Sequence, residues 1–264
     1  DRAMAVQGGE PCMVFLEGEF WGFYFIREKQ DADFVEAHYG IDKDNVTFIK
    51  NSELDDGSKD LDREYKEFLK WAGSADMTDP ANYEKVCNSV DIQSFIDMIV
   101  IETYINNVDW ATEYMNNWIT WRATEPDESL AYADGKWRYM LYDLDFSADY
   151  FDDARSLVGF DSLNNLYMGN DPYNFVPMFY NLLKNKDFAD QFYNSYIDVM
   201  KNNFDPVKVS EKLDEFVEKY KEAITITNTR FDQEWVNLNY DAEIEAFRQF
   251  FIGRRNLAKM YLDK

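Results

Sequence analysis

Residues 91–106 constrain the fold of this chain more than any other segment. Apolar side chains recur there at the three- and four-residue spacing of an α-helix: Ile92, Phe95, Ile96, Ile99, Val100 and Tyr104. A helix that is apolar over so much of its surface must be buried by other elements. We therefore expect a core helix here, with the rest of the chain packed around it.

Short apolar and aromatic runs bounded by turn residues predict strands on both sides of this helix. The predicted strands are residues 12–16, 20–26, 45–50, 114–122 and 136–142. Glu17, Gly18 and Glu19 separate the first two strands and indicate a hairpin. The last two strands flank a polar, turn-rich stretch, which predicts a second hairpin with a long loop. We expect a polar loop at residues 55–59.

Helical spacing and capping residues predict most of the remaining elements. The predicted helices are residues 31–39, 60–71, 174–184, 186–203, 206–223 and 242–262, with a short one beginning at Pro80. This order predicts an α+β fold in one domain, residues 1–264. A small antiparallel β-rich part, residues 1–59, would pack on a mainly helical part, residues 60–264. Because the first residue is Asp1, we expect the sequence to begin inside a longer or processed chain.

The composition excludes several classes of protein. The chain has 51 acidic and 27 basic residues and a formal net charge of −24. A nucleic-acid binder or a protein that docks on anionic membranes needs basic surface instead. No apolar run approaches the length of a membrane-spanning helix. A hydrophobic content of 46% and an aromatic content of 17% provide a sizeable core, so the chain is not a disordered acidic tail.

The scarcity of His and Cys limits the chemistry further. His38 is the only histidine, and we expect it to be structural or exposed. Cys12 and Cys87 are too few for a zinc site. They are expected to be two buried thiols, with one disulfide between them as the alternative. Any catalysis therefore uses carboxylates, Asn, Lys, Arg and metal ions.

The densest polar group lies in residues 106–145. Acids and amides near strand ends, without His or Cys, suit hard cations such as Mg²⁺. Kinases carry a catalytic Asp, then a metal-binding Asn and then a metal-binding Asp along the chain. The same order occurs here, with an Asn seven or eight residues after the first Asp and a second Asp at the end of a strand. The alternative is that these residues only cap a helix and a turn. They are Asn106, Asn107, Asp109, Asn116, Asn117, Asp143 and Asp145.

Three motifs occur in one order along the chain: VFLEGEFWGFYFIREK at 14–29, NVDWATEYMNNW at 107–118 and KWRYMLYDLDFS at 136–147. In these motifs the chain resembles the CotH family, which is named for a spore-coat protein. Residues 251–262, FIGRRNLAKMYL, resemble the Arg-bearing helix that closes the family's domain. The resemblance covers about residues 13–262.

The resemblance implies an atypical protein-kinase-like fold and a kinase that uses ATP with Mg²⁺ (or Mn²⁺). Such a kinase transfers the γ-phosphoryl group to Ser or Thr of secreted or surface proteins. It also implies a secreted or cell-surface location in a bacterium, with coat, cell-surface or cellulosome proteins as partners.

The resemblance also assigns roles to residues in the predicted hairpin 109–145 and the N-terminal strands. Asp109 is the catalytic or substrate-orienting acid. Lys50 would bind phosphate and Glu28 would orient that lysine, although an exposed lysine and a surface ion pair are the alternatives. The metal ligands would be Asp143, Asp145, Asn116 and Asn117.

Two departures from the family's pattern leave a second function open. The loop 111–115 lengthens the spacing between Asp109 and the asparagines, and Asp145 is followed by Phe146 and Ser147 without the usual glycine. The alternative is therefore a catalytically inactive surface or scaffold module, or a carbohydrate-associated binding module, on the same fold.

Overall fold

A computed structural model describes residues 2, 4–112, 114–149, 154–231 and 240–264. Its strands are β1 (Gly9–Leu16), β2 (Glu19–Arg27), β3 (Val46–Lys50), β4 (Glu53–Asp56), β5 (Trp118–Ala123) and β6 (Arg138–Leu141). Its helices are α1 (Ala32–Tyr39), α2 (Lys59–Ala72), α3 (Pro80–Ser89), α4 (Ile92–Tyr104), α5 (Val176–Leu182), α6 (Lys186–Asp198), α7 (Pro206–Arg230) and α8 (Tyr240–Leu262). Small antiparallel sheets followed by helices confirm the α+β class.

The main sheet has four antiparallel strands in the order β4-β3-β5-β6. Phe48 of β3 lies opposite Trp121 of β5, and Ile119 of β5 lies opposite Met140 of β6. The pairing of β5 with β6 confirms the second predicted hairpin. Because β3 and β4 precede residue 60 and β5 and β6 follow it, the sheet joins the two parts of the chain.

Both faces of this sheet are covered by helices, because its strands alternate side chains between two apolar layers. On one face, Phe48, Ile119 and Met140 form a cluster with Phe34 and Val35 of α1. Ile49, Trp118 and Tyr139 point to the other face, where they join the larger core around α4.

Helix α4 is the predicted core helix, and its C-terminal end is closed by a buried arginine. Arg254 of α8 donates to the backbone carbonyls of Thr103 and Tyr104, both at 2.7 Å, and to Oδ1 of Asn106 at 2.6 Å. It also donates to carbonyls in the segment 158–160. Since the last carbonyls of a helix lack intrahelical partners, Arg254 satisfies acceptors that would otherwise be buried unpaired.

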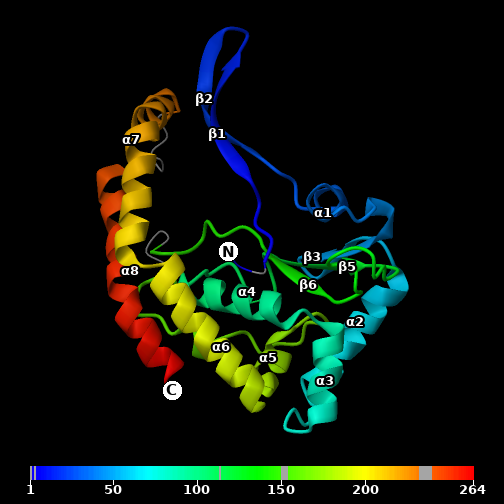
Figure 1. The fold of residues 1–264 in the computed structure, drawn as a ribbon. Coiled ribbons are helices and arrows are strands. Elements are labelled where there is room, and N and C mark those ends of the chain that lie inside the picture. The colour runs from blue at the N-terminus through cyan, green and yellow to red at the C-terminus, as the bar shows by residue number, and fades with distance from the viewer. Residues whose placement is uncertain (1, 3, 113, 150–153, 232–239) are drawn as a thin grey trace.

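Strands β1 and β2 form a separate two-stranded ribbon that projects beside the upper part of α7 (Figure 1). Glu17 and Gly18 make its tight turn with φ of 51° and 88°, as the hairpin signal predicts. The backbone N–H of Phe23 donates to Oγ1 of Thr227 at 2.8 Å, which attaches the ribbon to α7.

Three expectations about the elements are wrong. Residues 53–56 form β4, where a polar loop was expected to begin at residue 55. Asn51 and Ser52 turn the chain with φ of 48° and 61°, and the lack of glycine there hides the hairpin signal. Strand β5 begins at Trp118 rather than at residue 114, and α7 continues to Arg230 rather than ending at 223.

Cys12 and Cys87 are free thiols, so the alternative of a disulfide between them is excluded, but both are half-buried and the expectation of buried thiols is wrong. Within the described ranges, no helix combines the length and apolarity needed to cross a membrane.

Candidate functional site

Asp109 follows the end of α4 and is held by a group of side-chain donors. The hydroxyl of Tyr114 and the amide of Asn116 donate to its Oδ1 at 2.8 and 3.0 Å. The amide of Asn117 donates to its Oδ2 at 3.0 Å. The structure thus brings Asp109 together with both predicted asparagines, and their amide groups fix the orientation of its carboxylate.

Asp143 and Asp145 lie just beyond the end of β6, where both residues are exposed. Asp143 has a φ of 54°, so the chain leaves its extended conformation at this residue. Desolvation raises the pKa of Asp145, and the negative charge of Asp143 and a hydrogen bond with it raise the pKa further. Arg27 at the end of β2 acts in the opposite direction. The two acids therefore interact with each other, whereas their role as metal ligands stays a prediction.

Asn107 connects these two groups. Its Oδ1 accepts from the backbone N–H of Asp109 at 3.1 Å, and its Nδ2 donates to the carbonyl of Asp143 at 3.2 Å. The same Nδ2 donates to Oε2 of Glu102 at 3.0 Å. One buried amide therefore ties the Asp109 loop, the Asp143 turn and helix α4 together.

Glu102 lies under this site as a fully buried carboxyl group on α4. Burial raises its pKa well above the ordinary range, and the charge of Asp143 raises it further. Its Oε1 has no hydrogen-bond partner among the described residues. Glu102 was not among the predicted site residues. It is one of two acids in the most apolar helix of the chain, the other being Asp97, and this signal could have identified it.

Lys50 ends β3 on the same side of the sheet as the acidic turn. Its ammonium lies 3.9 Å from the centre of the Tyr142 ring, and Tyr142 directly precedes Asp143. Among the described residues Lys50 has no ion pair, so its charge remains available to an anion. This contact with Tyr142 was not anticipated from the sequence.

Glu28 does not pair with Lys50. Its Oε1 lies 2.8 Å from Nε2 of His38, and its Oε2 accepts from the backbone N–H of Gly8 at 2.8 Å. These hydrogen bonds, with that of His38 the larger, lower the pKa of Glu28. In the described chain Glu28 therefore makes a surface hydrogen bond with His38, and the predicted Lys50–Glu28 pair is wrong.

The donor set is suited to a hard cation, although it is small. No group of three or more His, Cys, Asp or Glu side chains is placed to hold a metal in the described ranges. Asp143 and Asp145 form a pair of interacting acids, and a cation between them would relieve the repulsion that raises the pKa of Asp145. Carboxylate and amide oxygens are the ligands that Mg²⁺ takes, usually with water and substrate phosphates.

A model of the family described as CotH kinase protein matches residues 1–257 of this chain of 264 residues. The match includes every candidate residue named above and both sheets. A comparison with curated proteins gives no match.

Proposed function

Because the chain belongs to the CotH kinase protein family, we propose that it transfers the γ-phosphoryl group of ATP to Ser or Thr of protein substrates. The observation that supports this proposal best is the fixed relation between Asp109 and the acid pair, which Asn107 holds through two hydrogen bonds. Phosphoryl transfer depends mainly on such positioning and on charge stabilisation.

Asp109 is proposed to orient the acceptor hydroxyl and to take its proton. Three side-chain donors hold its carboxylate, so little reorganisation is needed when a hydroxyl approaches. Tyr114 and Asn116 both donate to Oδ1, while Oδ2 has one side-chain donor and keeps more acceptor capacity. General-base assistance of this kind contributes about 10²–10⁴ to a rate.

Asp143 and Asp145 are proposed to hold Mg²⁺ or Mn²⁺, with the amide oxygens of Asn116 or Asn117 as further ligands. When bound there, a divalent ion would neutralise negative charge on the phosphates of ATP. Lys50 would bind the phosphates, because its ammonium lies over Tyr142 beside the acidic turn. A chain with a net charge of −24 repels free nucleotide, so ATP is expected to bind with its cation.

The test is transfer of labelled phosphate from ATP to the protein itself or to a Ser-rich peptide, with Mg²⁺ and with Mn²⁺. We expect Asp143→Asn to lower kcat/KM about a thousandfold, since a metal contributes several kcal/mol. Asp109→Asn should lower kcat with little change in KM for ATP. Asp190→Asn is the control, because Asp190 is exposed and its one ion pair among the described residues is with its helix neighbour Lys186. Equal transfer by wild type and Asp143→Asn, or none by wild type with either metal, would overturn the proposal.

A non-catalytic surface or scaffold module is the second candidate, and the exposed apolar residues of the ribbon favour it. Met13, Phe15 and Ile26 are 61%, 59% and 69% exposed. Large exposed apolar side chains concentrated on one projecting ribbon are typical of a binding element. Nucleotide-dependent stabilisation separates the two: ATP with Mg²⁺ at 100 times its Kd would stabilise the kinase by about 2.7 kcal/mol, whereas a scaffold would show no shift.

A secreted or cell-surface location in a bacterium belongs to the same proposal, as do coat, cell-surface or cellulosome partners. These points are supported by the family alone.

A further inference from the structure

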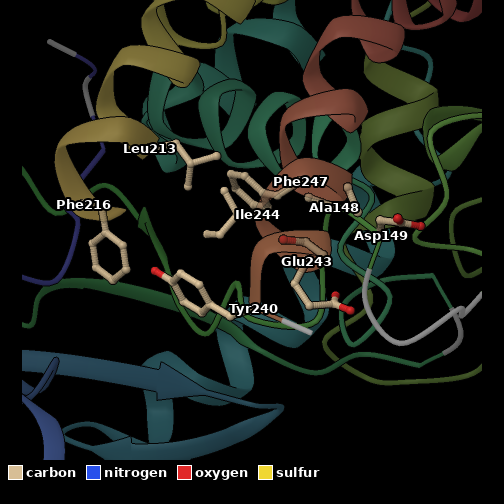
Figure 2. A pocket seen from close by; sticks show the side chains of 10 residues that line it. Ala148, Asp149, Leu213, Phe216, Tyr240, Glu243, Ile244 and Phe247 are labelled. Atoms are coloured by element: carbon tan, nitrogen blue, oxygen red, sulfur yellow. The ribbon is translucent and has the colours of Figure 1, made fainter. Parts of the chain in front are cut away.

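A cavity of about 340 Å³ lies between α7, α8 and the segment that follows Asp145. Leu213 and Phe216 of α7 and Ile244 and Phe247 of α8 give it apolar walls, and Figure 2 shows these side chains around a common space. The charged residues among its described lining are both acids, Asp149 and Glu243.

The cavity continues as a groove along the two helices. A neighbouring hollow is lined by Leu213, Phe216 and Phe247 as well, together with Phe204 and Phe251. Its charged lining residues balance, with Lys208 and Lys212 against Glu211 and Glu215, so the excess of acid lies in the first cavity. Helix α7, which is described in full, has no buried residue in its 25 positions. The apolar side of α7 is therefore only partly covered, which is typical of a surface that receives a partner.

The inner wall of the groove is bonded to the candidate active site. The backbone N–H of Val108 donates to the carbonyl of Phe146 at 2.9 Å, and that of Ala148 donates to the carbonyl of Ile105 at 2.9 Å. The segment 146–148 is thus attached to the loop that presents Asp109.

The charge and the polar groups of the cavity select its occupant. Asp149 and Glu243 favour a cationic ligand, and a second copy of a chain with net charge −24 would be repelled. The hydroxyl oxygen of Tyr240, which also lines the cavity, is buried and has no hydrogen-bond partner among the described residues. A peptide backbone entering the cavity would satisfy it.

We propose that this groove docks a basic segment of the protein substrate, which inserts a large apolar side chain between Phe216 and Phe247 and places Lys or Arg beside Asp149 and Glu243. The inference rests on the proposed kinase function for the identity of the partner as a substrate. The docking itself is a binding event that can be measured without phosphoryl transfer.

The probe is a fluorescein-labelled synthetic peptide with one Ser, one Phe and flanking Arg residues in a Gly/Ala background. Its binding is measured by fluorescence anisotropy without nucleotide. The protein variants are Phe247→Gln and Glu243→Lys, with Ile252→Gln as the matched control. Ile252 is an exposed apolar residue of the same helix that does not line the groove, and Phe247 is itself 37% exposed, so these variants are expected to fold.

We expect Phe247→Gln and Glu243→Lys to weaken peptide binding at least about tenfold, and Ile252→Gln to leave it unchanged. Where transfer is active, the same variants should raise KM for the peptide and leave KM for ATP unchanged. Loss of binding in the two variants without any transfer by wild type would support docking and overturn the kinase proposal. Docking is overturned if wild type binds no such peptide, if all variants bind it equally, or if ATP displaces it competitively.

Discussion

Helices α4 and α7 show opposite relations to the rest of the molecule. Eleven of the thirteen residues of α4 are buried, whereas none of the 25 residues of α7 is. Both helices begin with an Asp cap and carry apolar residues at helical spacing. The difference teaches that α4 is a fixed support for the candidate site, while α7 keeps an apolar side partly open to solvent.

The end of α4 carries both the structural cap and the first site residues. Arg254 makes five hydrogen bonds, of which two close the end of α4 and the others bind Asn106 and the carbonyls of Val158 and Phe160. Asn107 then links the end of α4 to Asp109 and Asp143. Helix α7 instead contacts the β1–β2 ribbon and α8, with Phe23 bonded to Thr227. Changes in the two regions should therefore separate stability from recognition.

The largest expected difference comes from removing one phenylalanine in each region. Phe95 is fully buried on α4, so Phe95→Ala should lower the free energy of unfolding by about 3–5 kcal/mol. Phe216 is only partly buried on α7, and Phe216→Ala should cost less than about 1.5 kcal/mol. Urea unfolding of both variants measures this. Equal losses would show that α7 is as firmly packed as α4.

Arg254→Met tests the cap of α4. Removing the guanidinium leaves several buried carbonyls without a donor, and the free energy of unfolding should fall by about 3 kcal/mol. Arg255→Met is the matched control, because Arg255 is partly exposed and pairs with Asp205 at 3.2 Å. That control should cost less than about 1 kcal/mol. An equal loss of unfolding free energy in both variants would show that Arg254 does not stabilise the end of α4 more than a surface arginine does.

Asn107→Ala is expected to affect stability less and activity more. It removes the bonds to Glu102, Asp109 and Asp143, and should lower the free energy of unfolding by about 1–3 kcal/mol. In the transfer assay kcat should fall, because the two acidic groups lose their fixed relation. Asn202→Ala, which removes an exposed amide bond to Asp198, is the control for stability and kcat. Unchanged kcat in Asn107→Ala would contradict the positioning of the site by this amide.

The smallest predicted effect is a pH dependence from Glu102. Burial raises its pKa in the folded state, so above the ordinary value of 4.5 the folded protein binds more protons than the unfolded chain. Stability therefore falls as pH rises from that value towards the folded pKa. Glu102→Gln removes this contribution. The urea midpoint of the variant should therefore increase relative to that of wild type as pH rises. Parallel pH profiles would show that Glu102 does not titrate differently on folding.

The same contrast explains what the sequence could predict. Strong periodicity and capping residues identified α4, α1 and both hairpins, because these signals are local, although β5 begins at Trp118 rather than at residue 114. Strand β4 was missed, since its turn uses Asn51 and Ser52 in left-handed conformations without glycine. The end of α7 was placed too early, because the threonines after residue 223 have a low helix propensity and yet the helix continues through them.

The site was predicted as a set of residues but not as a geometry. The sequence placed Asp109 near Asn116 and Asn117, and Asp143 near Asp145, through short separations along the chain. It could not show that Asn107 joins the two groups, because that bond depends on how β6 ends beside α4. For the same reason Glu28 was assigned to Lys50, whereas the chain that leaves β2 brings Glu28 within hydrogen-bond distance of His38 on α1.

The central claim is tested most directly by a crystal structure of the protein with Mn²⁺ and a non-hydrolysable ATP analogue, using the anomalous signal of manganese. The account predicts a manganese peak between the carboxylates of Asp143 and Asp145, with the nucleotide phosphates reaching Lys50. A manganese peak elsewhere, or nucleotide bound away from these residues, would contradict it.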